Sequence, residues 1–124
     1  MESVINTQPH RRYNILTDEW VLVSPHRTKR PWQGKTDKSI PIKKAKYDEG
    51  CYLCPTNKRA SGDINPDYSR TYSFKNDFAA LLEDTEENTF SSGLLKASTE
   101  AGLCKVICFS PNHSLTLPLM SASE

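Results

Sequence analysis

The chain has 124 residues, 36% of them apolar and 25% charged, which is the balance of one soluble globular domain. Its formal charge of +1 argues against a dedicated nucleic-acid binder, because affinity for a phosphate backbone grows with the number of charges that the protein neutralises. No apolar run approaches the ~20 residues of a membrane span, and Met1 is not followed by the basic and apolar regions of a secretory leader. We therefore expect a cytoplasmic protein with neither a membrane nor a nucleic-acid partner.

Extended segments separated by turns dominate the first part of the chain. Residues 11–13 and 19–24 predict a hairpin around the turn-prone residues 14–18. The chain is basic over residues 26–31, and the lysine-rich residues 35–47 predict a solvated connection.

Two more strands are predicted in the second part of the chain, at residues 71–74 and 103–109. Residues 83–102 carry Glu, Asp, Thr, Ser and Gly with little period, so we expect a mobile loop there. Ser121 and Glu124 have the spacing of a capping box, which predicts a helix start and a chain that continues. Together these elements predict an α+β fold built on an antiparallel sheet.

Cys51 and Cys54 are separated by two residues, which lets one tight turn aim both thiolates at a single zinc ion. The same pair could be a redox dithiol or two unrelated thiols, and the spacing leaves these alternatives open. His113 follows the last predicted strand and is either a third ligand or a solvent-facing turn residue. Cys104 and Cys108 share one face of that strand about 13 Å apart, too far for one zinc ion, so we expect buried thiols there.

Two polar segments are candidates for ligand binding. The cationic side chains of Arg27-Thr-Lys-Arg30 could hold an anion through charge-assisted bonds, or they could form a solvated basic turn. Asn76 and Asp77 could bond a sugar or a base edge, although turn chemistry explains them equally well. No catalytic triad, glycine-rich phosphate loop or carboxylate pair stands out, so the spacing of residues identifies no nucleophile.

The chain carries a series of motifs whose order is more specific than any one of them. They are His10-Arg-Arg-Tyr-Asn14, Trp20-Val-Leu-Val-Ser-Pro-His-Arg27, Lys29-Arg-Pro-Trp-Gln-Gly34, Cys51-x-x-Cys54, Asn65-Pro-Asp-Tyr68, Asn76-Asp-Phe-Ala-Ala-Leu81 and Val106-Ile-Cys-Phe-Ser-Pro111. In this order they resemble the N-terminal part of the galactose-1-phosphate uridylyltransferases, a family related to the histidine-triad proteins. The resemblance is close over residues 10–82 and 103–119 and poor over residues 83–102.

The resemblance implies an antiparallel half-barrel sheet of the histidine-triad type, incomplete in this chain. Residues 1–124 would then be part of an N-terminal domain, without the rest of that domain or the second domain. The implied activity is that of a nucleotidyltransferase that exchanges UMP between UDP-glucose and galactose 1-phosphate in the Leloir pathway, by ping-pong through a uridylyl-histidine. The implied partners are UDP-glucose, UDP-galactose, hexose 1-phosphates and a second subunit in a homodimer.

Several residues acquire roles by the same resemblance. Three of the four ligands of a structural zinc would be Cys51, Cys54 and His113. The sugar nucleotide bound by the partner subunit would contact Arg27, Thr28, Lys29 and Arg30. The uridine end would be lined by Ala60, Asn76 and Asp77. The nucleophile belongs to a His-Pro-His motif that this sequence does not contain, so we assign no catalytic residue and expect the 124-residue chain alone to be inactive.

The chain departs from the family pattern at Glu100-Ala-Gly102, where Ala-Arg-Gly is expected.

Two other classes of protein also stay open. A small zinc-stabilised binding module for an acidic or nucleic-acid partner would use the same cysteines with the basic loop. A redox protein would use Cys51 and Cys54 as a dithiol. Neither class accounts for Asn76-Asp-Phe together with Pro31-Trp-Gln-Gly.

Overall fold

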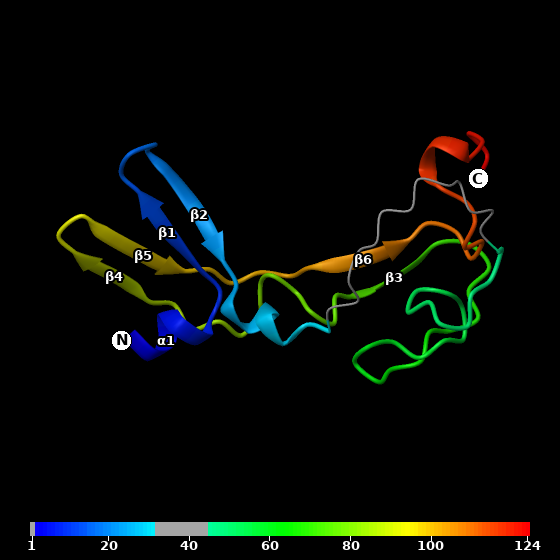
Figure 1. Ribbon diagram of the computed structural model, residues 1–124, viewed down its shortest axis with the longest axis horizontal. Helices are drawn as coiled ribbons and strands as arrows, with labels where there is room; N and C mark the ends of the chain where they lie inside the picture. The colour runs from blue at the N-terminus through cyan, green and yellow to red at the C-terminus, as the bar shows by residue number, and fades with distance from the viewer. Residues whose placement is uncertain (1, 32–44) are drawn as a thin grey trace. The chain divides into compact units, whose positions relative to one another are not determined.

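The computed structural model of the chain describes residues 2–31 and 45–124 (Figure 1). The structure divides into two compact units, and each unit is made of two stretches of the chain. Unit 1 comprises Met1–Arg30 and Phe78–Lys105, and unit 2 comprises Pro31–Asp77 and Val106–Glu124. Most of the connection predicted over residues 35–47 lies outside the described residues, as do Trp32, Gln33 and Gly34 of the basic loop motif.

Unit 1 is built on an antiparallel sheet of four strands in the order β2-β1-β5-β4, visible as two adjacent hairpins in Figure 1. The strands are β1 (His10–Asn14), β2 (Glu19–Val23), β4 (Thr89–Ser92) and β5 (Leu95–Thr99). A short helix, α1 (Glu2–Thr7), precedes the sheet and was not predicted. Its β-branched and polar residues have low helix propensity, whereas Ile5 is buried, so packing rather than local sequence favours it.

The hairpin predicted near the start of the chain is confirmed by β1 and β2, which pair from His10 opposite Val23 to Asn14 opposite Glu19. Asp18 in the turn has a φ of 55°, a left-handed conformation that a short polar side chain tolerates. The Tyr13 hydroxyl donates to Asp18 Oδ1 at 2.6 Å. Local polar bonds of this kind explain why a turn signal in the sequence located the hairpin correctly.

The loop predicted over residues 83–102 is wrong, because β4 and β5 form a second hairpin there. Ser92 lies opposite Leu95, which leaves a two-residue turn that begins with Gly93. Gly93 has a φ of 58°, and such turns favour glycine at their first position. The sequence signal is weak because the strands are rich in Ser, Thr and Lys. Phe90 and Ala97 are the apolar pair in register across them.

Two buried polar residues of unit 1, His10 and Thr99, have hydrogen-bond partners, whereas Nδ1 of His26 is buried with none among the described residues. His10 is fully buried, donates from Nδ1 to the carbonyl of Gln8 at 2.8 Å, and accepts at Nε2 from Arg12 Nε at 3.0 Å. The hydroxyl of buried Thr99 donates to the carbonyl of Glu86 at 2.7 Å. These bonds offset the cost of removing polar atoms from water.

The departure from the family pattern at residues 100–102 lies in an ordered part of unit 1. The carboxylate of Glu100 forms an ion pair with Arg11. A Cβ atom added to Gly102 would lie 2.7 Å from Cδ1 of Leu81, so glycine permits a close approach here. Gly102, which matches the glycine of the expected Ala-Arg-Gly pattern, therefore has a packing role in this chain.

Unit 2 contains little regular structure among its described residues. Strands β3 (Tyr72–Lys75) and β6 (Lys105–Cys108) pair in a two-stranded sheet, and a 3₁₀-helix spans Leu117–Leu119. β3 confirms the strand predicted at 71–74, and β6 confirms the centre of the one predicted at 103–109. Val106 and Cys108 share the more buried face of β6, with Cys108 buried. Cys104 is only half-buried, which corrects the expectation of two buried thiols.

The polar segment predicted to begin a helix forms part of a capping box. The Ser121 N–H donates to the Glu124 carboxylate at 2.9 Å, which is the backward bond of that motif. The Ser121 hydroxyl donates to the same carboxylate oxygen at 2.9 Å. The spacing in the sequence therefore predicted the backward bond, but the Glu124 N–H donates to the Ser121 carbonyl at 3.1 Å instead of the hydroxyl, and residues 122–123 form a turn.

Candidate functional site

The two cysteines and the histidine predicted as metal ligands meet in unit 2. Cys51, Cys54 and His113 each offer one ligand atom, and these atoms lie within 4.8 Å of one another. Cys54 is buried, and the other two residues are half-buried. Within residues 2–31 and 45–124, this is the one group of three or more His, Cys, Asp or Glu side chains that could hold a metal ion.

The donor set and its spacing fit a tetrahedral metal. Sγ of Cys54 and Nδ1 of His113 are 3.4 Å apart. A tetrahedral zinc ion with a Zn–S bond of ~2.3 Å and a Zn–N bond of ~2.0 Å would separate such atoms by about 3.5 Å. Soft thiolates combined with an imidazole favour zinc over hard cations, which prefer oxygen ligands. The three side chains are therefore suited to a metal of this class.

Backbone bonds and a nearby carboxylate orient these ligands. The backbone N–H of Leu53 donates to Sγ of Cys51 at 3.4 Å, and the backbone N–H of His113 donates to the carbonyl of Lys46 at 2.7 Å. Oδ2 of Asp48 lies 3.9 Å from Nε2 of His113, on the ring nitrogen opposite to Nδ1. A ligating histidine commonly presents its other ring N–H to a carboxylate, so the geometry favours Nδ1 as the ligand atom.

Cys108 lies close to the metal turn without joining the ligand group. Its Sγ lies 3.9 Å from the carbonyl oxygen of Leu53, and the Tyr68 hydroxyl donates to the same oxygen at 2.5 Å. Burial raises the pKa of the Cys108 thiol and the pKa of Tyr68 above their ordinary values. Cys108 is buried, as predicted, and the raised pKa keeps its thiol protonated at neutral pH. Burial likewise raises the pKa of Cys54, whose thiol must lose its proton to bind a metal.

Asp77, predicted to contact a nucleoside, is held by an arginine that the sequence analysis did not single out. Nε of Arg59 donates to Oδ2 of Asp77 at 3.0 Å, and the two side chains are 8% and 14% exposed. Burial acts to lower the pKa of Arg59, but the bonds to Asp77 and Tyr72 outweigh it and raise that pKa. The ion pair joins the chain segments that carry Ala60 and Asn76.

The predicted anion-binding residues lie on and directly after the 3₁₀-helix Pro25–Lys29 of unit 1. They are Arg27, Thr28, Lys29 and Arg30, and all four are exposed. Two side chains tie this helix to another part of unit 1. The Ser24 hydroxyl donates to the carbonyl of Ala80 at 2.7 Å, and Nε2 of His26 donates to the carbonyl of Ala79 at 2.6 Å. The helix is anchored at its start, while its cationic side chains face solvent.

Sequence reasoning missed Arg59 and Asp48 as residues of the site, and it treated Asn65 only as part of a motif. Arg59 follows Lys58 in a stretch with no pattern that predicts burial, and arginine is rarely buried without a partner. The motif Asn65-Pro-Asp-Tyr68 did carry a signal, but an asparagine before proline is also an ordinary turn residue. Pairing with residues distant in sequence is what gives these side chains their roles.

A family model described as galactose-1-phosphate uridyl transferase, N-terminal domain, matches residues 2–124. The chain belongs to this family. It is 61% identical over 117 residues, 94% of the chain, to the galactose-1-phosphate uridylyltransferase of Haemophilus influenzae. It is 49% identical over 127 residues, 96% of the chain, to that of Saccharomyces cerevisiae, and 51% identical over 124 residues, 91% of the chain, to that of Schizosaccharomyces pombe.

The family that the motifs indicated is thus confirmed, and the chain matches the N-terminal domain of that family. The chain spans about a third of the length of these relatives, with 34%, 35% and 34% of their sequences covered. Its architecture is a small α+β arrangement of mostly antiparallel strands, as predicted. Among the described residues of this family member, no helix has the length and apolar character needed to cross a membrane.

Proposed function

We propose that the chain is the N-terminal part of a UDP-glucose:hexose-1-phosphate uridylyltransferase, which exchanges UMP between UDP-glucose and galactose 1-phosphate during galactose breakdown. The family match over residues 2–124 carries this proposal, and neither the binding module nor the redox protein accounts for that match. The antiparallel sheet would be part of a half-barrel of the histidine-triad type. The enzyme would be a cytoplasmic homodimer that also accepts UDP-galactose.

Zinc is the metal that we assign to Cys51, Cys54 and His113. Two thiolates and an imidazole nitrogen supply three donors of the usual zinc set, and the fourth donor would be water or a residue outside this group. Bound zinc would be structural, holding the turn and the loop of His113 together. It would take no part in the transfer of UMP.

We assign the nucleotide contacts to the residues that the family resemblance indicates. Asn76 and Asp77 would bond the uridine end, which Ala60 would line. The ion pair with Arg59 supports this role, because it holds the Asp77 carboxylate in place, and the remaining lone pairs of that carboxylate can accept hydrogen bonds. Arg27, Thr28, Lys29 and Arg30 are exposed, and three of them are cationic, so they suit the phosphates of a nucleotide bound to the partner subunit.

An exchange assay tests this function. Purified complete enzyme that carries this chain should convert UDP-glucose and galactose 1-phosphate to UDP-galactose and glucose 1-phosphate. The 124-residue chain alone should show no turnover above background, because a uridylyl-histidine needs a positioned nucleophile. The described histidines of unit 1, His10 and His26, instead bond backbone carbonyls. Turnover by the chain alone that disappears when His26 or His113 is replaced would contradict the proposal.

A further inference from the structure

A buried asparagine connects the metal turn to the rest of unit 2. Asn65 is 2% exposed, and its amide nitrogen donates to the carbonyls of Tyr52 and Cys54 at 2.8 and 3.0 Å. Its Oδ1 accepts from Nη1 of Arg59 at 3.1 Å. The orientation of the amide is forced, because carbonyls only accept and a guanidinium only donates. One planar side chain therefore spans the turn and the arginine.

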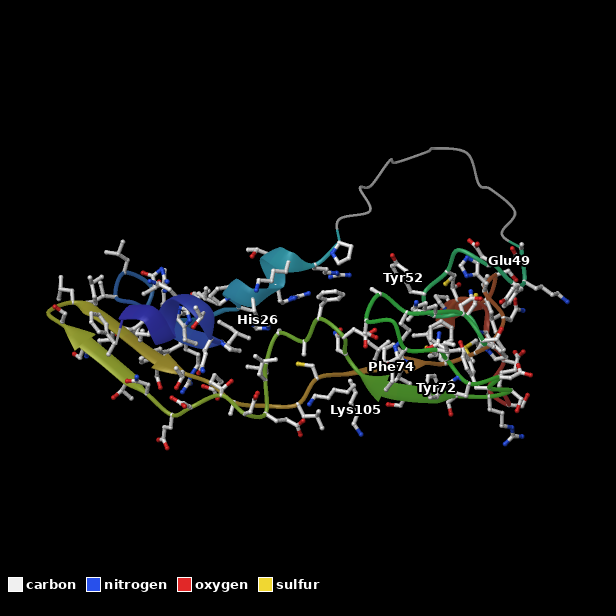
Figure 2. The ribbon with its side chains drawn as sticks, turned by 90° about the horizontal axis from the view of Figure 1, so that it is seen from below. His26, Glu49, Tyr52, Tyr72, Phe74 and Lys105 are labelled. Atoms are coloured by element: carbon white, nitrogen blue, oxygen red, sulfur yellow. The ribbon has the colours of Figure 1, made fainter. Side chains whose placement is uncertain are left out.

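Arg59 continues the connection to the predicted nucleoside carboxylate. Its Nε donates to Asp77, and its Nη2 donates to Asp63 at 3.0 Å. The guanidinium carbon lies 4.2 Å from the ring centroid of Phe74 on β3. Figure 2 shows Phe74 and Tyr72 along that strand. The guanidinium is thus held from several sides and has little room to rotate by itself. A displacement of Asn65 should therefore also displace the Asp77 carboxylate.

We propose that Asn65 and Arg59 form a relay that couples metal binding at Cys51 and Cys54 to the orientation of the Asp77 carboxylate. The relay consists of the Tyr52 and Cys54 carbonyls, the Asn65 amide, the Arg59 guanidinium and Asp77. It rests on the proposed function, in which Asp77 contacts the nucleoside. Asn65 and Arg59 are then positioning residues, since neither is assigned a contact with the metal or the nucleotide.

The geometry explains why the coupling is strong. A metal bound by both cysteines fixes the turn, and the turn presents its two carbonyls to a single amide. Hydrogen bonds that are shielded from water polarise one another, and a displaced member leaves a buried polar group without its partner. Coupling between two binding sites is reciprocal, so the nucleotide must strengthen metal binding by the factor by which the metal strengthens nucleotide binding.

The relay can be tested by a cycle of variants in the complete enzyme that carries this chain. The affinity for UMP is measured by calorimetry with zinc bound and after removal of zinc by a chelator. In the unaltered enzyme, zinc removal should weaken UMP binding at least fivefold, in the usual range of allosteric coupling. Saturating UMP should raise the zinc affinity by the same factor. Arg70→Lys, which changes an exposed arginine of the same unit, should leave both effects intact.

Two variants cut the relay at different bonds. Arg59→Lys keeps the positive charge but loses the planar guanidinium, whose Nη1 donates to Asn65 and whose Nε donates to Asp77. Asn65→Asp keeps the acceptor for Arg59 but loses both donors to the turn, so the relay remains testable if the first variant does not fold. In either variant the affinity for UMP should no longer depend on zinc.

The outcomes separate the relay from the function on which it rests. If Asp77→Asn leaves the affinity for UMP unchanged, the proposed nucleoside role of Asp77 is wrong. If Asp77→Asn weakens binding, but zinc removal and Arg59→Lys act independently and their effects multiply, the nucleoside role stands and the relay is overturned. Zinc that holds the turn and the loop of His113 together without any link to Asp77 predicts this independent behaviour, because loss of zinc would then weaken UMP binding equally in every variant.

Discussion

The two units of the molecule are stabilised by different kinds of interaction. Unit 1 has a four-stranded ladder of main-chain bonds, and apolar side chains such as Trp20 and Leu22 remain exposed on it. Unit 2 has two short strands among its described residues, and its buried Asn65 and Arg59 bond carbonyls and carboxylates instead. The sheet tolerates side-chain changes because backbone groups make its bonds, whereas the candidate site depends on particular side chains.

Of all the substitutions, those of the metal ligands in unit 2 should have the largest effect, because the candidate site depends on particular side chains. Cys51→Ser should weaken zinc binding by more than ~100-fold, since even partners outside the ligand set are worth 10- to 100-fold. Competition with a chromophoric chelator measures this change. Hydrogen exchange should show that loss of the metal exposes the amides of unit 2 and leaves the ladder of unit 1 protected.

Cys104→Ser is the matched control for the metal site, because Cys104 is also half-buried but lies outside the ligand group. It should leave zinc stoichiometry and affinity nearly unchanged. A requirement for Cys104 but not for His113 would show that the ligands are assigned wrongly.

Two arginines allow a direct comparison of ion pairs between the units. Arg59→Met should lower the free energy of unfolding by about 3–5 kcal/mol, because it removes the ion-pair partner of the nearly buried Asp77 carboxylate. Arg11→Met in unit 1 should cost less than about 1 kcal/mol, since its side chain is 46% exposed and solvent screens its pair with Glu100. Denaturant unfolding measures both values. Equal costs would show that the buried ion pair stabilises unit 2 no more than the exposed pair stabilises unit 1.

Substitutions in the second hairpin of unit 1 should cost less than the loss of Arg59. Gly93→Ala places a side chain at a φ of 58°, which costs roughly 1–2 kcal/mol. Ser91→Ala on the adjoining strand is exposed and should change the free energy of unfolding by less than about 0.5 kcal/mol. If Gly93→Ala proves more costly than Arg59→Met, unit 1 rather than unit 2 depends on single residues.

Local signals in the sequence predicted much of the local structure. The turn residues between β1 and β2 located the first hairpin, and the apolar segments located β3 and the centre of β6. The second hairpin was missed because its strands are polar, and a polar strand shows no clear alternation until its partner is known. The cysteine spacing indicated a turn that could hold a metal, but it left the redox and unrelated-thiol alternatives open.

By itself, the sequence determined the family through the order of its motifs, and the resemblance to that family also named His113 as a ligand. It determined the first hairpin, two more strands and the pair of candidate thiol ligands because these depend on residues near one another in the chain. Only the tertiary structure brought His113 to Cys54, from 59 residues away, and buried Arg59 against Asp77, 18 residues away. An isolated histidine or arginine has no periodicity that reveals its partner. Its role follows from the path of the chain, which places the partner atoms within bonding distance and removes them from water.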